Sequence, residues 1–278
     1  MCKSVLIPNH ACLFLTMKFK WDNKVVLVTG SCRGLGLEIA KRLLDLNARV
    51  VFHSKYTPLP NDPSIIQAFE TNQAIYLQAD LRNAAEVERL IAAASDKFER
   101  LDVVINNAGI SAFGSMEQVE LSIFQEVLDT NLLGSVHISK AAIPALKKTK
   151  GSILYVSSLA GLFGVPRYIS YSMSKAALRQ LRDGLALELH DTGVHVGLVY
   201  LGFVDNDAAK YALDSVGNKL AIAQRNKLLS ISKRYASKSI LTSVEKRKSV
   251  SYIPLSGKLF SVITFLFSGV LSMLLRGR

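Results

Sequence analysis

Six short apolar runs alternate with stretches of helical periodicity along the chain. The runs are nearly continuous in Val, Ile and Leu and cover residues 25–28, 49–52, 74–77, 103–105, 152–156 and 195–200. Such runs are typical of strands buried on both faces. The stretches with helical spacing are 35–46, 84–98, 122–146 and 170–190. This alternation predicts an α/β fold with a doubly wound parallel sheet.

The pattern also predicts one domain with an appended segment at each end. We expect the domain to cover residues 17–254. Residues 1–16 contain only one short apolar run, too short for a signal peptide, and read as an unstructured extension. Met17 is therefore a possible alternative start. Residues 255–278 are expected to form an apolar C-terminal helix.

The C-terminal segment contains 259–275, a run of 17 residues without a charge. As a helix it would measure roughly 25 Å, which is the short limit for crossing a bilayer. We expect this helix to be embedded in a membrane or to lie in its interface. Burial in a homodimer interface is the alternative.

Composition and charge narrow the class of protein. Hydrophobic residues make up 49% and charged residues 20%, which excludes a disordered chain. The net charge is +12, and residues 218–278 hold twelve Lys or Arg and one acid, Glu245. A neutral body with a basic end opposes nucleic-acid binding and favours an anionic neighbour such as a membrane surface. The positive charges would place the main domain on the cytoplasmic side. A solvated basic face is the simpler alternative.

The cysteines indicate a reducing compartment. The chain has only Cys2, Cys12 and Cys32, too few and too clustered for a disulfide framework. No His and Cys spacing suggests a metal site, and we expect none.

A glycine-rich turn follows the first predicted strand. Glycine permits positive φ and close approach of a backbone, and the N-terminus of the next helix offers free N–H groups to a pyrophosphate. We therefore expect a dinucleotide to bind at Gly30, Ser31, Arg33, Gly34, Leu35 and Gly36. A plain tight turn is the alternative.

The second predicted strand ends without an acid. Ser54 stands where an acid would bond the ribose 2′-hydroxyl of NAD, and Lys55 follows it. Arg33 lies in the glycine turn. Two cations and no acid favour NADP(H) as the cofactor, because they can neutralise a 2′-phosphate.

Tyr171 and Lys175 are four residues apart in a helical pattern and so share one helix face. A tyrosine with the usual pKa near 10 is a poor acid or base at neutral pH, but a nearby ammonium lowers that pKa. Such a pair can act as a general acid and base. Ser158 precedes them at the end of the fifth predicted strand, at the sheet edge where open α/β sheets bind their ligands.

Taken together, these motifs resemble the classical short-chain dehydrogenase/reductase family over residues 19–254. The motifs that carry the resemblance are Gly30-x-x-x-Gly34-x-Gly36, Asn106-Asn107-Ala108-Gly109, Asn131, Ser158, and Tyr171 with Lys175. The resemblance implies a Rossmann-type sheet and a nicotinamide cofactor. It also implies that Ser158 binds the substrate oxygen, Tyr171 transfers the proton, Lys175 binds the ribose and Asn131 holds a relay water.

The resemblance further implies the rest of the cofactor site. Asn107, Ala108 and Gly109 would line the adenosine ribose, and Asp80 with Leu81 would meet the adenine. The chain departs from the family after the sixth strand, where Leu201 replaces a proline and Asn206 stands near a threonine that contacts the nicotinamide amide. Residues 208–247 are expected to form a helical substrate flap.

The function favoured by the sequence is an NADP(H)-dependent oxidoreductase acting on a carbonyl or secondary alcohol. The apolar and basic flap favours an apolar, lipid-like substrate, although a lid packed on the core fits the same pattern. A non-catalytic dinucleotide-binding regulator is the alternative, but it need not retain Asn131, Ser158, Tyr171 and Lys175 together. A basic membrane-binding or nucleic-acid-binding module is a third hypothesis.

Overall fold

The protein is built around a seven-stranded parallel sheet with the strand order β3-β2-β1-β4-β5-β6-β9. The computed structural model describes residues 19–205, 210–222, 230–266 and 269. The strands are β1 (Val25–Val28), β2 (Arg49–Ser54), β3 (Ala74–Gln78), β4 (Val103–Asn106), β5 (Ser152–Ser158), β6 (His195–Leu201), β7 (Tyr211–Leu213), β8 (Lys219–Ala221) and β9 (Val250–Ile253). The helices are α1 (Gly34–Asp45), α2 (Pro63–Glu70), α3 (Ala84–Phe98), α4 (Leu121–Leu128), α5 (Gly134–Thr149), α6 (Ile169–Glu188), α7 (Lys233–Glu245) and α8 (Ser256–Leu266).

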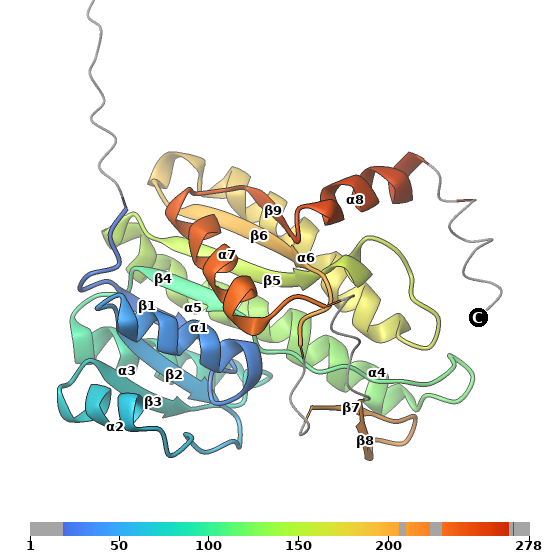
Figure 1. Cartoon of the computed structure of the whole chain (residues 1–278), viewed down its shortest axis with the longest axis horizontal. Coiled ribbons are helices and arrows are strands. Elements are labelled where there is room, and N and C mark those ends of the chain that lie inside the picture. Colours follow the sequence, from blue (N-terminus) through green and yellow to red (C-terminus); the bar gives the residue numbers. More distant parts are fainter. Residues whose placement is uncertain (1–18, 206–209, 223–229, 267–268, 270–278) are drawn as a thin grey trace, which may run out of the picture.

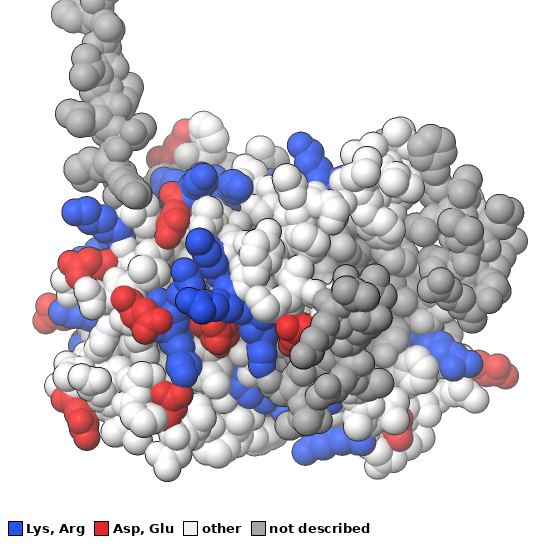
Figure 2. Space-filling model, in the orientation of Figure 1, with Lys and Arg blue, Asp and Glu red and all other residues white. Residues whose placement is uncertain are grey.

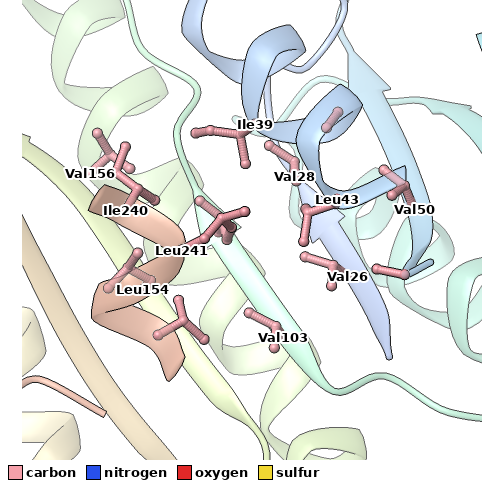
Figure 3. Packing of buried hydrophobic residues seen from close by; sticks show 14 of the residues in the cluster. Val26, Val28, Ile39, Leu43, Val50, Val103, Leu154, Val156, Ile240 and Leu241 are labelled. Atoms are coloured by element: carbon pink, nitrogen blue, oxygen red, sulfur yellow. The ribbon is translucent and has the colours of Figure 1, made fainter. Parts of the chain in front are cut away.

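Helices cover both faces of the sheet. In Figure 1, α1 and α7 lie in front of it, and Figure 3 shows Ile39 and Ile240 of these helices packed toward the strands. On the opposite face α3 and α5 contribute Leu90 and Ile138. Because both faces are covered, every side chain of Val25–Val28 is fully buried. This explains the continuous apolar runs and confirms the predicted fold.

The strand order reverses direction between β1 and β4, which are neighbours although two strands separate them in sequence. At such a switch point the loops beyond the carboxyl ends of the two strands diverge and leave room for a ligand. The loop after β1 holds the glycine turn, and the loop after β4 holds Asn107–Gly109. The topology therefore brings the predicted cofactor residues to one edge.

Helix α7 lies within the predicted flap, and strand β9 follows it at residues for which the sequence predicted no strand. Helix α7 packs against α1 through Ile240 and Leu241, so it belongs to the core. Strand β9 pairs with β6 at the edge of the sheet, with Tyr252 beside Tyr200. Because β9 lies at the sheet edge, only alternate residues of this strand are buried. Its sequence therefore has no continuous apolar run, and the strand was not predicted.

The prediction that 208–247 forms a helical flap is therefore wrong for residues 211–221, and its helical part, α7, packs in the core. Residues 211–221 form an antiparallel β-hairpin of β7 and β8 instead of a helix. The hairpin attaches to the loop after β4 through a bridge between Ala112 and Leu213, and Phe113 N donates to Leu213 O at 2.8 Å. Pairing with a distant loop, which no local periodicity records, determines this structure.

The helix expected over 122–146 is divided into two. A wide π-helical turn, Asp129–Leu133, joins α4 to α5. Such turns insert an extra residue and occur often at functional sites. Here the turn carries Asn131, which is fully buried.

Helix α8 begins the predicted C-terminal helix and lies against the loop after Ser158. Phe260 contacts Phe163 edge-on, with 5.3 Å between ring centroids, and a Cβ on Gly257 would lie 3.0 Å from Leu159. Within the residues that the structure describes, no helix has the length and apolar character needed to cross a membrane. Most of the run 259–275 after Leu266, and the predicted extension 1–16, lie outside the described residues.

Candidate active site

The three glycine positions of the glycine turn do not accept a side chain. Gly30 and Gly34 have φ values of +65° and +60°, which L side chains rarely adopt. A Cβ on Gly36 would collide with the carbonyl oxygen of Gly30 and lie 2.6 Å from Asn107 Nδ2. The residue before α1, Arg33, makes no side-chain cap, so the first N–H groups of this helix are left for a ligand. The turn thus fits a pyrophosphate.

Asn107 and Ala108 are tied to the same turn. Thr29 Oγ1 accepts hydrogen bonds from the backbone N–H groups of Asn107 and Ala108, each at 3.0 Å. Asn107 Nδ2 donates to Thr29 O at 3.0 Å and to Gly30 O at 3.3 Å. The Asn107 side chain therefore clamps the loops after β1 and β4 together, which places their backbones at the cofactor edge.

His53 is a further residue of this edge, and the sequence analysis missed it. Its Nδ1 accepts from Gly30 N at 3.2 Å, and its Nε2 donates to Ala79 O at 3.1 Å. Burial lowers the pKa of His53 to about 4, so the ring is neutral at pH 7. It joins the turns after β1 and β3. A lone histidine at a strand end has no sequence signal for this role.

His53 leads to a prediction about pH. The unfolded side chain has its ordinary pKa of 6.5 and the folded one about 4, so unfolding takes up a proton between these values. The free energy of unfolding should therefore fall as the pH drops from about 6.5 to 4, by up to about 3 kcal/mol from this group. Urea unfolding at several pH values measures this, and His53→Gln should flatten the dependence.

His195→Gln is the matched control, since burial also lowers the pKa of His195 to about 4. This residue begins β6, so it lies at the amino ends of the strands, away from the cofactor edge. Both substitutions should flatten the pH dependence, and only His53→Gln should weaken dinucleotide binding. An unchanged pH dependence in His53→Gln would contradict the assignment.

The two cations predicted to select NADP(H) differ in their surroundings. Lys55 Nζ lies 2.8 Å from Asp80 Oδ2, and Arg82 Nη2 lies 2.7 Å from the same oxygen. These cations hold the pKa of Asp80 well below its usual range. Since Arg82 also pairs with Glu126, the group is neutral overall. Arg33 forms no ion pair with any described residue, so it supplies the uncompensated charge.

Ser54 and Leu81, which were also predicted to line the adenosine site, contact other parts of the protein. Ser54 Oγ donates to Thr57 O at 2.5 Å and lies 3.0 Å from Tyr76 Oη. Leu81 is buried, and a Cβ on Gly134 would lie 2.9 Å from its Cβ. Both shape the edge beyond β2 and β3. Asn206, predicted to contact the nicotinamide, lies outside the described residues.

The carboxyl end of β5 carries Ser158, and Lys175 of α6 is bonded to this part of the strand. Ser158 is its last residue, and its Oγ accepts from Ala160 N at 3.1 Å. Tyr171 lies in the first turn of α6, and Lys175 Nζ lies 5.9 Å from the centroid of its ring. Ser157 Oγ donates to Lys175 O at 2.8 Å and fastens the helix to the strand. The predicted helix face is thus present.

Lys175 is a buried cation at this site. Its Nζ donates to Val156 O at 2.9 Å, which leaves two of its three N–H donors for other groups. Burial lowers the pKa of Lys175 to about 8, and the positive charge of Lys210 adds to this effect. At neutral pH the ammonium is still mostly protonated beside the phenol. This is the arrangement that an acid–base tyrosine needs.

Asn131 holds the loop that passes beside Lys175. Its Oδ1 accepts from Ile110 N at 2.8 Å, and its Nδ2 donates to Ile110 O and Ser174 Oγ, both at 2.9 Å. A Cβ on Gly109 would lie 3.1 Å from Asn131 Oδ1 and 3.3 Å from Lys175 Nζ. These residues are therefore adjacent. Ser174, which the sequence analysis did not select, connects Asn131 to α6.

Comparison with known proteins agrees with this geometry. Residues 24–216 match the family model described as short chain dehydrogenase. The chain belongs to this family. Our short-chain dehydrogenase is 36% identical over 186 residues to a 3-oxoacyl-[acyl-carrier-protein] reductase of Synechocystis sp., with 66% of the chain and 75% of the relative covered. It is 32% identical to an L-fucose dehydrogenase of Rattus norvegicus, with 66% and 67% covered.

A solved structure shows the same fold. The short-chain dehydrogenase from Burkholderia cenocepacia, in complex with NADP, matches with a TM-score of 0.74 at 23% identity and covers 92% of this chain and 99% of its own. The predicted family is confirmed. This short-chain dehydrogenase is thus an oxidoreductase of a nicotinamide-dependent family.

Proposed function

We propose that the protein is an NADP(H)-dependent oxidoreductase that transfers a hydride between nicotinamide and a carbonyl or secondary alcohol of an apolar substrate. The observation that carries the reaction is the buried Lys175 ammonium beside the Tyr171 ring, with Ser158 at the same strand end. A buried cation destabilises the fold unless it has a partner or a task. A non-catalytic regulator would give Lys175 no catalytic task that offsets this cost.

Each side chain has one task in this reaction. Ser158 Oγ hydrogen-bonds the substrate oxygen, and Tyr171 Oη gives that oxygen its proton during reduction or takes it during oxidation. The Lys175 ammonium stabilises the phenolate that remains. Asn131 keeps the loop at Gly109 against Lys175, and its relay water remains part of the proposal. The bound nicotinamide supplies or accepts the hydride.

Arg33 is the feature that favours NADP(H). It is exposed at the glycine turn and has no acidic partner among the described residues, whereas the charge of Lys55 is offset by Asp80. A 2′-phosphate would therefore gain most from Arg33. The Burkholderia cenocepacia relative was solved in complex with NADP, which supports the same cofactor here.

We expect NADPH to bind more tightly than NADH. A charged hydrogen bond from arginine to phosphate is stronger than a hydrogen bond between neutral groups. Arg33→Ala should therefore weaken NADPH binding by about 10-fold or more and leave NADH binding within about 2-fold. Lys55→Ala should have a smaller effect, because it also releases Asp80. Titration of nucleotide fluorescence measures these constants, and equal affinity of the wild-type protein for both cofactors would contradict NADP(H) dependence.

An apolar substrate is favoured by the surroundings of Ser158. The loop after it carries Leu159 and Phe163, which contact α8, and Phe203 beyond β6 is 60% exposed. The Synechocystis relative is named for an acyl substrate, which agrees, whereas the rat relative is named for a sugar. A panel of steroids, retinoids, long-chain aldehydes and 3-keto lipids, followed by NADPH absorbance, identifies the class.

Membrane attachment through α8 is part of the same proposal. Its exposed side chains include Leu259 (65%) and Leu266 (61%), and Leu255 before it is 74% exposed. Figure 2 shows charged side chains over α1 and α7 but largely uncharged atoms where α8 lies. An apolar surface of this kind, continued by the uncharged residues up to 275, suits the interface of a bilayer.

A further inference from the structure

The β7–β8 hairpin reaches across the switch point of the sheet. It is attached to the loop after β4 through Ala112 and Leu213, yet its first residue, Tyr211, contacts Arg33 in the turn after β1. Lys210, just before the hairpin, is close enough to Lys175 for its charge to act on that ammonium. The hairpin therefore lies beside both halves of the cofactor edge, the glycine turn and the catalytic helix.

Tyr211 binds two cations. The Arg33 guanidinium carbon and the Lys219 Nζ each lie 5.0 Å from the centroid of its ring, within the range of cation–π attraction. Lys219 reaches the ring diagonally across the hairpin, since its direct partner is Leu213. Each such contact is weak at an exposed site. One ring thus holds two like charges that repel each other.

Neither cation has an acidic partner in the part of the chain that the structure describes. Among the residues that the structure describes, no ion pair includes Arg33 or Lys219, while Lys55 is paired with Asp80. Acids are absent from the described contacts of Tyr211 as well. Two cations on one ring beside the glycine turn, neither with a described acidic partner, attract a multiply charged anion, and phosphate is an anion that both lysine and arginine bind.

We propose that Lys219, which contacts the same Tyr211 ring as Arg33, is a second phosphate-binding residue of the cofactor site and binds the 2′-phosphate of NADP(H). This inference rests on the proposed NADP(H)-dependent function. The sequence predicted Arg33 and Lys55 as the two cations that bind this phosphate. The inference replaces Lys55 by Lys219 of the hairpin. Lys219 binds the phosphate directly, and Tyr211 is a positioning residue whose ring contacts both Lys219 and Arg33.

The test compares two nucleotides that differ only in the phosphate concerned. Adenosine 2′,5′-bisphosphate and adenosine 5′-monophosphate are titrated calorimetrically into the full-length protein. Lys219→Gln should weaken the bisphosphate by about 3- to 10-fold and leave the monophosphate within about 2-fold, because it removes one charge contact to the 2′-phosphate. Lys219→Arg retains the charge and should retain the affinity.

Tyr211 is tested by a matched pair. Tyr211→Phe keeps the ring and should leave bisphosphate binding within about 2-fold, whereas Tyr211→Ala should weaken it as much as Lys219→Gln. Lys246→Gln removes an exposed charge at the end of α7 and controls for net charge. An Arg33→Ala, Lys219→Gln double variant should lose less than the sum of the single losses, because the two cations share one phosphate.

The outcomes separate this inference from the proposed function. If the wild-type protein prefers the bisphosphate but Lys219→Gln binds it unchanged, NADP(H) dependence stands and the role of Lys219 is wrong. The inference also fails if Lys219→Gln and Lys246→Gln lose the same affinity, since net charge alone then explains the loss. A wild-type protein without preference for the bisphosphate overturns both.

Discussion

Tyr171→Phe is expected to abolish nearly all turnover while NADPH still binds. The substitution removes only the phenolic hydroxyl, which we propose to be the proton donor, and general acid catalysis typically contributes about 10²- to 10⁴-fold to a rate. The ring, its packing in the first turn of α6 and its contact with Lys175 remain. The change in kcat on a substrate found with the panel measures the effect.

Tyr168→Phe is the matched control. Tyr168 precedes α6 and packs against Phe113 with its ring, 5.2 Å between centroids, so removing its hydroxyl one turn from the site should leave kcat within about 2-fold. NADPH affinity should stay within the same range in both variants. Wild-type turnover in Tyr171→Phe would show that another group transfers the proton, and the mechanism would have to be reassigned.

The second large effect concerns membranes. The full-length protein should sediment with membranes and require detergent for release, because the apolar surface of α8 would otherwise be exposed to water. The basic residues of 218–278 should add about 1 kcal/mol each where they lie near anionic lipid. High salt alone should not release the protein, since salt screens charge but not apolar burial.

Two variants locate the attachment. A chain ending at Pro254 should move to the soluble fraction, and NADPH binding reports whether it is folded, since the truncation uncovers Phe163 and Leu159. A triple substitution of Leu259, Val262 and Leu266 by Asn keeps Phe260 on Phe163 and should weaken sedimentation. A soluble, detergent-free dimer of the intact chain would instead place α8 in a homodimer interface.

Local sequence determined the parts of this protein whose environment repeats along the chain. Strands covered on both faces must be apolar at successive positions. The strands β1 to β6 were therefore predicted close to their observed bounds. The glycine turn was equally predictable, because its positive φ values and the missing space at Gly36 exclude other residues. The spacing of Tyr171 and Lys175 follows from the geometry of one helix.

Other features depend on pairings that local patterns do not record. The edge strand β9 and the β7–β8 hairpin are set by partners far along the chain, and the sequence predicted helix where the hairpin lies. Only the tertiary structure showed that Asp80 offsets Lys55 while Arg33 has no described acid. The same holds for His53 and Ser174, single polar residues whose roles appear when separate turns are brought together. The sequence determined which chemistry the chain carries, and long-range contacts decided which of its charges remain available to a cofactor.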